Sequence, residues 1–297
     1  MKKIFFVVNV IIAAGFISSC NNREENTSNP EVAIVDSATI SSKESEQREF
    51  ITIPYPDEMF SFIKQIGSDG KSTTHLNNVE NYKKYVDNKS RALNFGIYAT
   101  DFLYCSTFDY NIEALKYFAT VKKLGDDLGI SGVINESVAE RIKKNVGKSD
   151  SLTDISNAVY FSAISELEKS DKASTLALVI AGGWIESMNL VTNMLKTYKA
   201  DNPAIVRIAE QKYTLSNLIG YLEKYQGDPN VVEVMMQLKE LNELYDGLKE
   251  EKIKSSLTTK NGKKILTGGV NISITEDQYK AICEKIKTIH DGFVSGK

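Results

Sequence analysis

Apolar residues recur at intervals of three or four through most of the chain after residue 57. This spacing places them on one face of a helix, so it predicts a series of amphipathic helices. Gly, Asp, Asn, Ser and Pro gather where the spacing breaks, and these residues favour helix caps and turns. The predicted helices span Glu58–Ile66, Val79–Phe108 with a break near Asp87, Asp109–Gly129, Asn135–Val146, Ser149–Lys169, Lys172–Lys199, Pro203–Gln226, Val231–Lys252 and Glu276–Phe293.

Short connections between long helices favour antiparallel neighbours. We therefore expect an all-α fold, an antiparallel multi-helix bundle, in a single helical domain over residues 54–297. The segment Thr258–Thr275 differs, because β-prone residues flank Asn261-Gly262, which is a strong hairpin-turn signal. At most one small β-hairpin is expected there, and an extended loop is the alternative because a lone two-stranded hairpin is marginally stable.

Two predicted helices, Ala92–Phe108 and Leu176–Leu190, are apolar on every face. A helix of this kind must be surrounded by others, so both are expected at the centre of the bundle. Each contains glycine, Gly96 in the first and Gly182-Gly183 in the second, although glycine inside a helix costs about 1 kcal/mol relative to alanine. Close approach of another helix is the favoured explanation, and space for a ligand is the alternative.

Two acidic residues, Asp101 and Glu186, lie beside the apolar turns of these central helices. A buried carboxylate needs partners or a shifted pKa. Tyr98 and Tyr104, three residues on either side of Asp101, could supply hydroxyl groups. The favoured interpretation is a polar network that fixes the register of the helices. The alternative is a ligand pocket lined by Tyr98, Asp101, Trp184 and Glu186.

An acidic pair could also indicate glycoside hydrolysis, which needs two carboxyl groups about 5–9.5 Å apart. The sequence has no nucleophile elbow, metal motif, glycine-rich phosphate loop or cofactor fingerprint. We therefore predict no catalytic residue, no metal ligand and no cofactor.

Composition narrows the possible partners further. The net charge is −3 and no basic stripe is present, so nucleic-acid binding is not expected. The two histidines, His75 and His290, lack the spacing of metal ligands. Cys105 and Cys283 lie within helical patterns on apolar flanks, so they are expected to be buried small hydrophobes, with a disulfide between them as the alternative.

The N-terminus has the pattern of a secretory signal. Lys2-Lys3 precede an apolar run from Ile4 to Phe16, and the small-residue stretch Ile17–Cys20 follows. A cysteine at this place resembles the lipobox of bacterial lipoproteins. The resemblance implies cleavage of residues 1–19, a diacylglycerol on the sulfur of Cys20 and an acylated amine. The alternative is an ordinary secretory signal in which Cys20 has no role.

Residues 20–53 are rich in Asn, Ser, Glu and Thr, so they cannot bury enough apolar surface to order themselves. We expect a flexible tether with an end-to-end span of roughly 30 Å. Asn21, rather than Asp, follows the cysteine, which by resemblance to lipoprotein sorting rules favours the outer membrane. The longest later apolar run, Leu176–Ile185, is too short to span a bilayer, so the membrane is expected as a partner through the lipid anchor alone.

The segments Ala92–Tyr104, Glu113–Ile130 and Ala181–Glu186 resemble an uncharacterised family of helical lipoproteins of Bacteroidota. The resemblance covers Tyr82–Tyr198 and implies fold and location, with no activity to transfer. Together with the N-terminus, it predicts a lipid-anchored cell-envelope protein, on the periplasmic face or the cell surface. Its expected role is that of a non-enzymatic scaffold or binding module for an envelope protein or a small ligand. The alternative is a small-ligand-binding or hydrolytic enzyme that uses the two acids.

Overall fold

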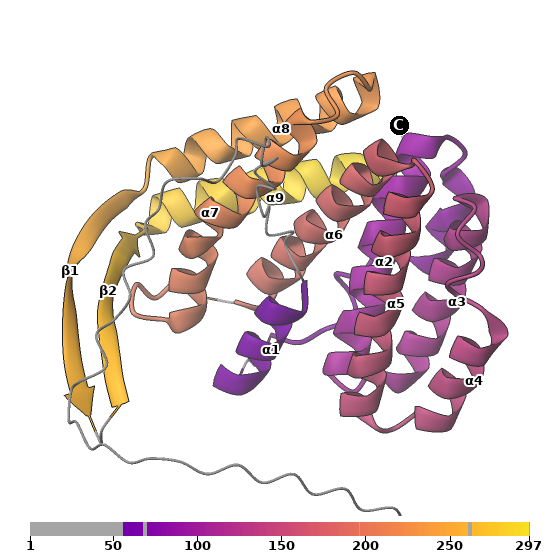
Figure 1. Ribbon diagram of the computed structural model, residues 1–297, viewed down its shortest axis with the longest axis horizontal. Helices are drawn as coiled ribbons and strands as arrows, with labels where there is room; N and C mark the ends of the chain where they lie inside the picture. The colour runs from indigo at the N-terminus through magenta and orange to yellow at the C-terminus, as the bar shows by residue number, and fades with distance from the viewer. Residues whose placement is uncertain (1–55, 68–69, 196, 261–262, 297) are drawn as a thin grey trace, which may run out of the picture. The chain divides into compact units, whose positions relative to one another are not determined.

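Helices account for most of the chain that the structure describes (Figure 1). This computed structural model describes residues 56–67, 70–195, 197–260 and 263–296, with the backbone alone for 255–260 and 263–268. The predicted signal peptide, Cys20 and the tether lie outside the described residues. The described residues all belong to one structural unit. Its described part is an all-α bundle with one β-hairpin near the C-terminus, as the apolar spacing predicts.

The elements follow one another along the chain with short, capped connections. Asp87, Asn202 and Asp228 each accept a hydrogen bond from a backbone N–H of the helix that they begin, and Thr275 forms a capping box with Gln278. In order the elements are α1 (Pro56–Ile66), a 3₁₀ helix η1 (Val79–Lys84), α2 (Asn88–Thr107), α3 (Asn111–Asp127), α4 (Glu136–Asn145), α5 (Ser149–Lys169), α6 (Ala173–Met194), α7 (Pro203–Glu223), α8 (Pro229–Asp246), β1 (Lys249–Lys260), β2 (Lys263–Ser273) and α9 (Glu276–Ser295).

Several helix boundaries differ from the sequence prediction, and the helix predicted to reach Lys199, for example, ends at Met194. Asp109 does not cap α3, because it closes the end of α2 with a left-handed φ of 66°. The N–H of Tyr110 then bonds to the carbonyl of Cys105 at 2.9 Å, as in a helix C-terminal motif. The helix predicted to reach Lys252 ends at Asp246, because the backbone after Gly247 pairs with β2 instead.

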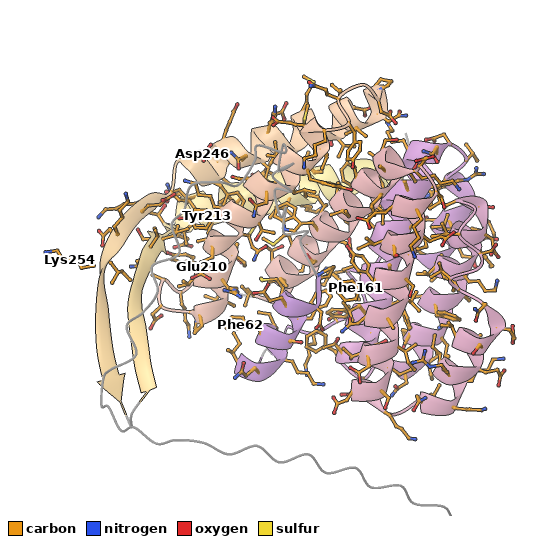
Figure 2. All side chains as sticks on the ribbon, viewed as in Figure 1. Phe62, Phe161, Glu210, Tyr213, Asp246 and Lys254 are labelled. Atoms are coloured by element: carbon orange, nitrogen blue, oxygen red, sulfur yellow. The ribbon has the colours of Figure 1, made fainter. Side chains whose placement is uncertain are left out.

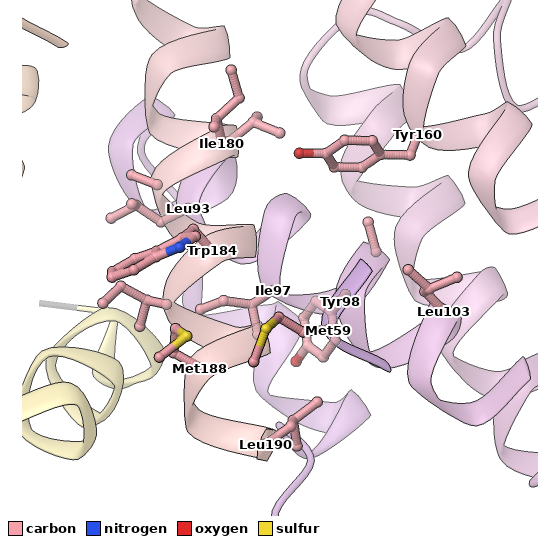
Figure 3. Close-up of a cluster of buried hydrophobic side chains, with 14 of the residues drawn as sticks. Met59, Leu93, Ile97, Tyr98, Leu103, Tyr160, Ile180, Trp184, Met188 and Leu190 are labelled. Carbon is pink, nitrogen blue, oxygen red and sulfur yellow. The ribbon is translucent and has the colours of Figure 1, made fainter. Parts of the chain in front are cut away.

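Helix α2 lies at the centre and packs against α3, α5 and α6. Helix α6 in turn packs against α1, α7, α8 and α9, so these two helices join the two groups of outer helices (Figure 1). Among the described helices, α6 alone is long and apolar enough to cross a membrane by composition, yet 94% of its apolar window is buried inside the domain. It is therefore a core helix, and its side chains interdigitate with those of α2 (Figure 3).

The contact between α2 and α6 depends on glycine. A Cβ atom on Gly96 would overlap the carbonyl oxygen of Val179 and lie 2.7 Å from the backbone nitrogen of Gly183. A Cβ atom on Gly182 would overlap the carbonyl oxygen of Leu93. The predicted close approach of the central helices is thus confirmed, and Gly96 and Gly182 carry it. Gly183 is less crowded, because its Cβ would meet Thr100 Oγ1 at 3.3 Å.

The two strands form an antiparallel ribbon whose register pairs Lys249 with Ser273 at its base. The ribbon continues from the ends of α8 and α9 and projects beyond them (Figure 1). At its base Ile272 is buried, and Oε1 of Glu250 accepts a hydrogen bond of 2.6 Å from Nζ of Lys212 on α7. These contacts support a hairpin longer than the predicted one. The predicted turn, Asn261-Gly262, lies outside the described residues.

Candidate functional site

Asp101, in the middle of α2, is fully buried. Its Oδ2 accepts a hydrogen bond of 3.3 Å from the backbone N–H of Asn77, which lies just before η1. The side chain of Asn77 donates to the hydroxyl of Tyr85 at 2.9 Å and to Oδ1 of Asn94 at 3.2 Å. The hydroxyl of Tyr117 on α3 donates to the carbonyl of Asn77 at 3.0 Å. The segment before η1 is thereby fixed over the polar side of α2.

Glu186 reaches the same region from α6 and is also fully buried. Its Oε2 lies 2.7 Å from Nε2 of His290, which α9 supplies. His290 is itself buried, and its other ring nitrogen lies 3.4 Å from Oδ1 of Asp291, which is half exposed. Three helices that are distant in sequence thus meet at one set of ionisable groups.

The two carboxyl groups interact directly. Burial raises the pKa of Asp101 well above its ordinary value, and the charge of Glu186 and a side-chain hydrogen bond with it raise this pKa further. Oδ1 of Asp101 and Oε1 of Glu186 have no other hydrogen-bond partner among the described groups. The raised pKa favours the neutral acid form of Asp101, whose proton supplies a donor that these oxygens otherwise lack.

His290 is the basic member of this buried group and lies beside the Glu186 carboxyl group. Burial lowers the pKa of His290, but the Glu186 carboxylate and the contact with Asp291 outweigh this, so the pKa of His290 is raised above its usual value. A protonated His290 places a positive charge beside the two buried carboxyl groups. This matters because an unpaired charge in the interior is costly.

The last turn of α9 closes the region. Nδ2 of Asn94 donates to the carbonyls of Ser90 and Phe293, each at 2.9 Å, and the hydroxyl of Tyr85 donates to the carbonyl of Val294 at 3.1 Å. The C-terminal carbonyls of a helix lack partners within it, so these side chains act as its cap. They also tie the last residues of α9 to the start of α2.

The structure brings together three of the four residues predicted to line a ligand pocket. Tyr98 lies next to the acids, and its hydroxyl donates to the carbonyl of Asn78 at 2.7 Å. Trp184 faces elsewhere on α6, beside Met188 in the apolar core (Figure 3), and its indole N–H donates to Oε1 of Gln211 at 3.3 Å. Tyr104 does not serve Asp101, because its hydroxyl bonds to the backbone of Ser72.

Chemically, this arrangement can hold protons, and in this structure it is closed to solvent. Asp101, Glu186 and Tyr98 each have an exposed fraction of 0%. The group therefore has the composition of an acid–base site and the enclosure of a structural network. In the described part of the chain, no group of three or more His, Cys, Asp or Glu side chains could hold a metal ion.

The two helical cysteines play no part in this network. Both Cys105, which is buried, and Cys283, which is half buried, are free thiols, so they are not bonded to each other. Burial raises the pKa of each thiol. A raised thiol pKa disfavours the reactive thiolate, which agrees with a packing role.

Asn77 and His290 were not predicted from the sequence as members of the network. A signal for His290 was present, because it lies four residues after Ile286 on the apolar stripe of α9. A polar side chain on such a stripe needs a buried partner. Asn77 lies in a polar loop and gave no comparable signal.

Comparisons of the chain with models of protein families, with curated proteins and with solved structures give no match.

Proposed function

We propose that this chain is a lipoprotein of the cell envelope, held on the outer membrane by acyl chains on Cys20, and that its helical domain is a non-enzymatic scaffold or binding module. The observation that carries the proposal is the N-terminal pattern, in which a basic start, an apolar run and a small-residue stretch end at Cys20. Two or more acyl chains hold a protein stably on a bilayer, so the domain needs no spanning helix.

The enclosure of the acids favours a structural role for them over a catalytic one. General acid–base chemistry needs a group within hydrogen-bond reach of the reacting atoms. Asp101 and Glu186 are both sealed behind α9 and the segment before η1. Their contacts with each other, with Asn77 and with His290 account for them as parts that hold α2, α6 and α9 in register.

The proposal is tested by replacing Cys20 with alanine and separating membrane from soluble fractions of cells that express the chain. The wild-type chain should partition with the outer membrane and incorporate labelled fatty acid, and Cys20→Ala should lose both properties. Cys283→Ala is the matched control, because it removes a half-buried thiol from α9 and should leave both unchanged. Retention of Cys20→Ala on the membrane with its label would refute the lipid anchor.

A further inference from the structure

The ribbon of β1 and β2 extends away from the helices beyond its base (Figure 1). At the base, Glu250 bonds to Lys212 of α7 and Ile272 is buried. Farther along, Ile253 and Val270 have exposed fractions of 54% and 37%. In the described part of the chain the sheet consists of β1 and β2 alone, so each strand has an outer edge without a neighbouring strand. The ribbon therefore presents side chains and backbone edges to the surroundings of the domain.

The charge of the ribbon is positive, although the net charge of the whole chain is −3. Residues 249–273 include six lysines and two glutamates, and none of residues 252–275 is acidic. Each glutamate has a lysine partner, because Oε1 of Glu250 lies 2.6 Å from Nζ of Lys212 and Oε1 of Glu251 lies 2.6 Å from Nζ of Lys249. The acidic groups of the ribbon are thus neutralised at its base, and the lysines beyond them are in excess.

The excess lysines begin with Lys252 and Lys254, which are both exposed. Neither of them forms an ion pair with another described residue, and Figure 2 shows Lys254 pointing away from the helices. Farther along, the register of the strands pairs Lys260 with Lys263, and Lys264 is the next residue of β2. The pairing of β1 with β2 therefore collects on one projection five positive charges that the linear sequence spreads out.

These features favour an anionic lipid surface over other partners. Apolar contact and electrostatic attraction add in binding to a bilayer interface, and the ribbon offers exposed Ile253 and Val270 beside its lysines. Residues 249–273 contain no arginine and no aromatic residue, the types that commonly bind nucleic-acid bases. Lysines on an edge strand also discourage pairing with a strand of another molecule, which disfavours a second copy of the chain as the partner.

The proposed anchor keeps the ribbon close to such a surface. Helix α1 is the first described element after the predicted tether, and it packs against α7, which also contacts β2. The tether has an expected span of roughly 30 Å, so a domain attached through it stays near the bilayer. Weak attraction is sufficient under these conditions, because the anchor raises the effective concentration of the ribbon at the lipid.

We propose that the ribbon of β1 and β2 is a second membrane contact, which binds the anionic headgroups of a phospholipid bilayer through its lysines. The acyl anchor holds the chain on the membrane, and the ribbon orients the domain with this end toward the lipid. This inference rests on the proposed lipoprotein and adds a contact that the anchor does not supply.

The test is co-sedimentation of the mature chain, residues 20–297 with Cys20→Ser, with vesicles of equal parts phosphatidylcholine and phosphatidylglycerol at low salt. The chain should bind these vesicles, should bind phosphatidylcholine vesicles much more weakly, and should be released by salt, which screens the attraction. Lys252→Gln/Lys254→Gln should weaken binding about ten- to thirtyfold, because each lysine near an anionic bilayer strengthens it about fivefold. The matched control, Lys116→Gln/Lys144→Gln, removes the same charge from exposed positions on α3 and α4 and should leave binding unchanged.

Four results would overturn the lipid contact. They are an absence of binding to the anionic vesicles, equal binding to neutral and anionic vesicles, equal losses in the two double variants, and tighter binding of a single-stranded oligonucleotide than of the anionic vesicles. The last result would assign the ribbon to a nucleic acid. The chain in this test carries no lipid, so its outcome is independent of the fractionation of Cys20→Ala. A failure of the ribbon and a failure of the anchor can therefore be told apart.

Discussion

Oε2 of Glu186 and Nε2 of His290 lie 2.7 Å apart and join the middle of α6 to the C-terminal part of α9. Both side chains are buried, and the carboxylate also faces Asp101. The stability of the domain therefore depends on the charge balance of three groups that no short segment of the chain contains.

Replacing His290 with glutamine should destabilise the domain strongly. The change leaves the Glu186 carboxylate buried without a counter-ion, and breaking a buried pair in this way typically costs about 3–5 kcal/mol. Urea unfolding at neutral pH measures the loss. The double variant Glu186→Gln/His290→Gln removes both charges and should recover a large part of it. If the two single changes simply add in the double variant, the two residues are not coupled.

Asp101→Asn should change how stability depends on pH. The folded pKa of Asp101 is raised, so its favourable contribution is complete below the unfolded pKa of about 3.9 and is lost as pH rises toward the folded pKa. The raised pKa of His290 acts in the same direction from about pH 6.5 upward. The stability of wild type relative to the Asp101→Asn variant, whose new amide does not titrate, should thus fall as pH rises above about 4.

Unfolding free energies at several pH values between 4 and 8 check this expectation. The amide of Asp101→Asn keeps an acceptor for the N–H of Asn77 and a donor for Glu186, so the variant should fold. A steeper fall of stability with pH in the variant than in wild type would contradict the neutral state of Asp101.

Gly96→Ala should lower the melting temperature by several degrees. Its Cβ would overlap the carbonyl of Val179, and overpacking of this kind costs about 1–3 kcal/mol, more if the backbones cannot separate. The matched control is Gly220→Ala on α7, where a Cβ meets nothing within 4 Å. It should raise the melting temperature, because alanine is the better helix former.

Leucine variants extend the same comparison. Gly183→Leu should also lower the melting temperature, since even its Cβ would lie 3.3 Å from Thr100 Oγ1 and the remaining side chain has no space beside α2. Thermal melts of Gly96→Leu and Gly183→Leu at or above wild type would show that the two helices can separate without loss.

Local patterns in the sequence predicted the helices well because periodicity and capping are local properties. Gly96 and Gly182-Gly183 indicated where the two central helices meet. Glycine destabilises a helix, so it is kept where a neighbouring helix comes close. The sequence could not say that Gly182, rather than Gly183, meets the opposing backbone, because this depends on the rotation of α6 about its axis. The end of α8 was predicted too late, because pairing of β1 with β2 outweighs the helical charge pattern after Gly247.

Two members of the candidate site were predictable from the sequence, but its assembly was not. Asp101 and Glu186 each stood out as acids on apolar helices. The two acids meet each other, and Asn77 and His290 complete the group, because four distant segments pack together in space. The periodicity of a sequence carries no information about how such segments pack. The same reason explains why Trp184, two residues before Glu186, was wrongly grouped with the acids: its indole points toward Gln211.

The contacts of Asn94 with Phe293 and of Tyr85 with Val294 also set an order of events during folding. A chain is made from its N-terminus, so Asn94 and Tyr85 exist long before the carbonyl groups of Phe293 and Val294 to which they donate. Until α9 arrives, Glu186 lacks its counter-ion and Asn94 lacks its acceptor at Phe293. A chain in which α9 has not yet been made therefore lacks these contacts, and it should be less stable than the complete domain.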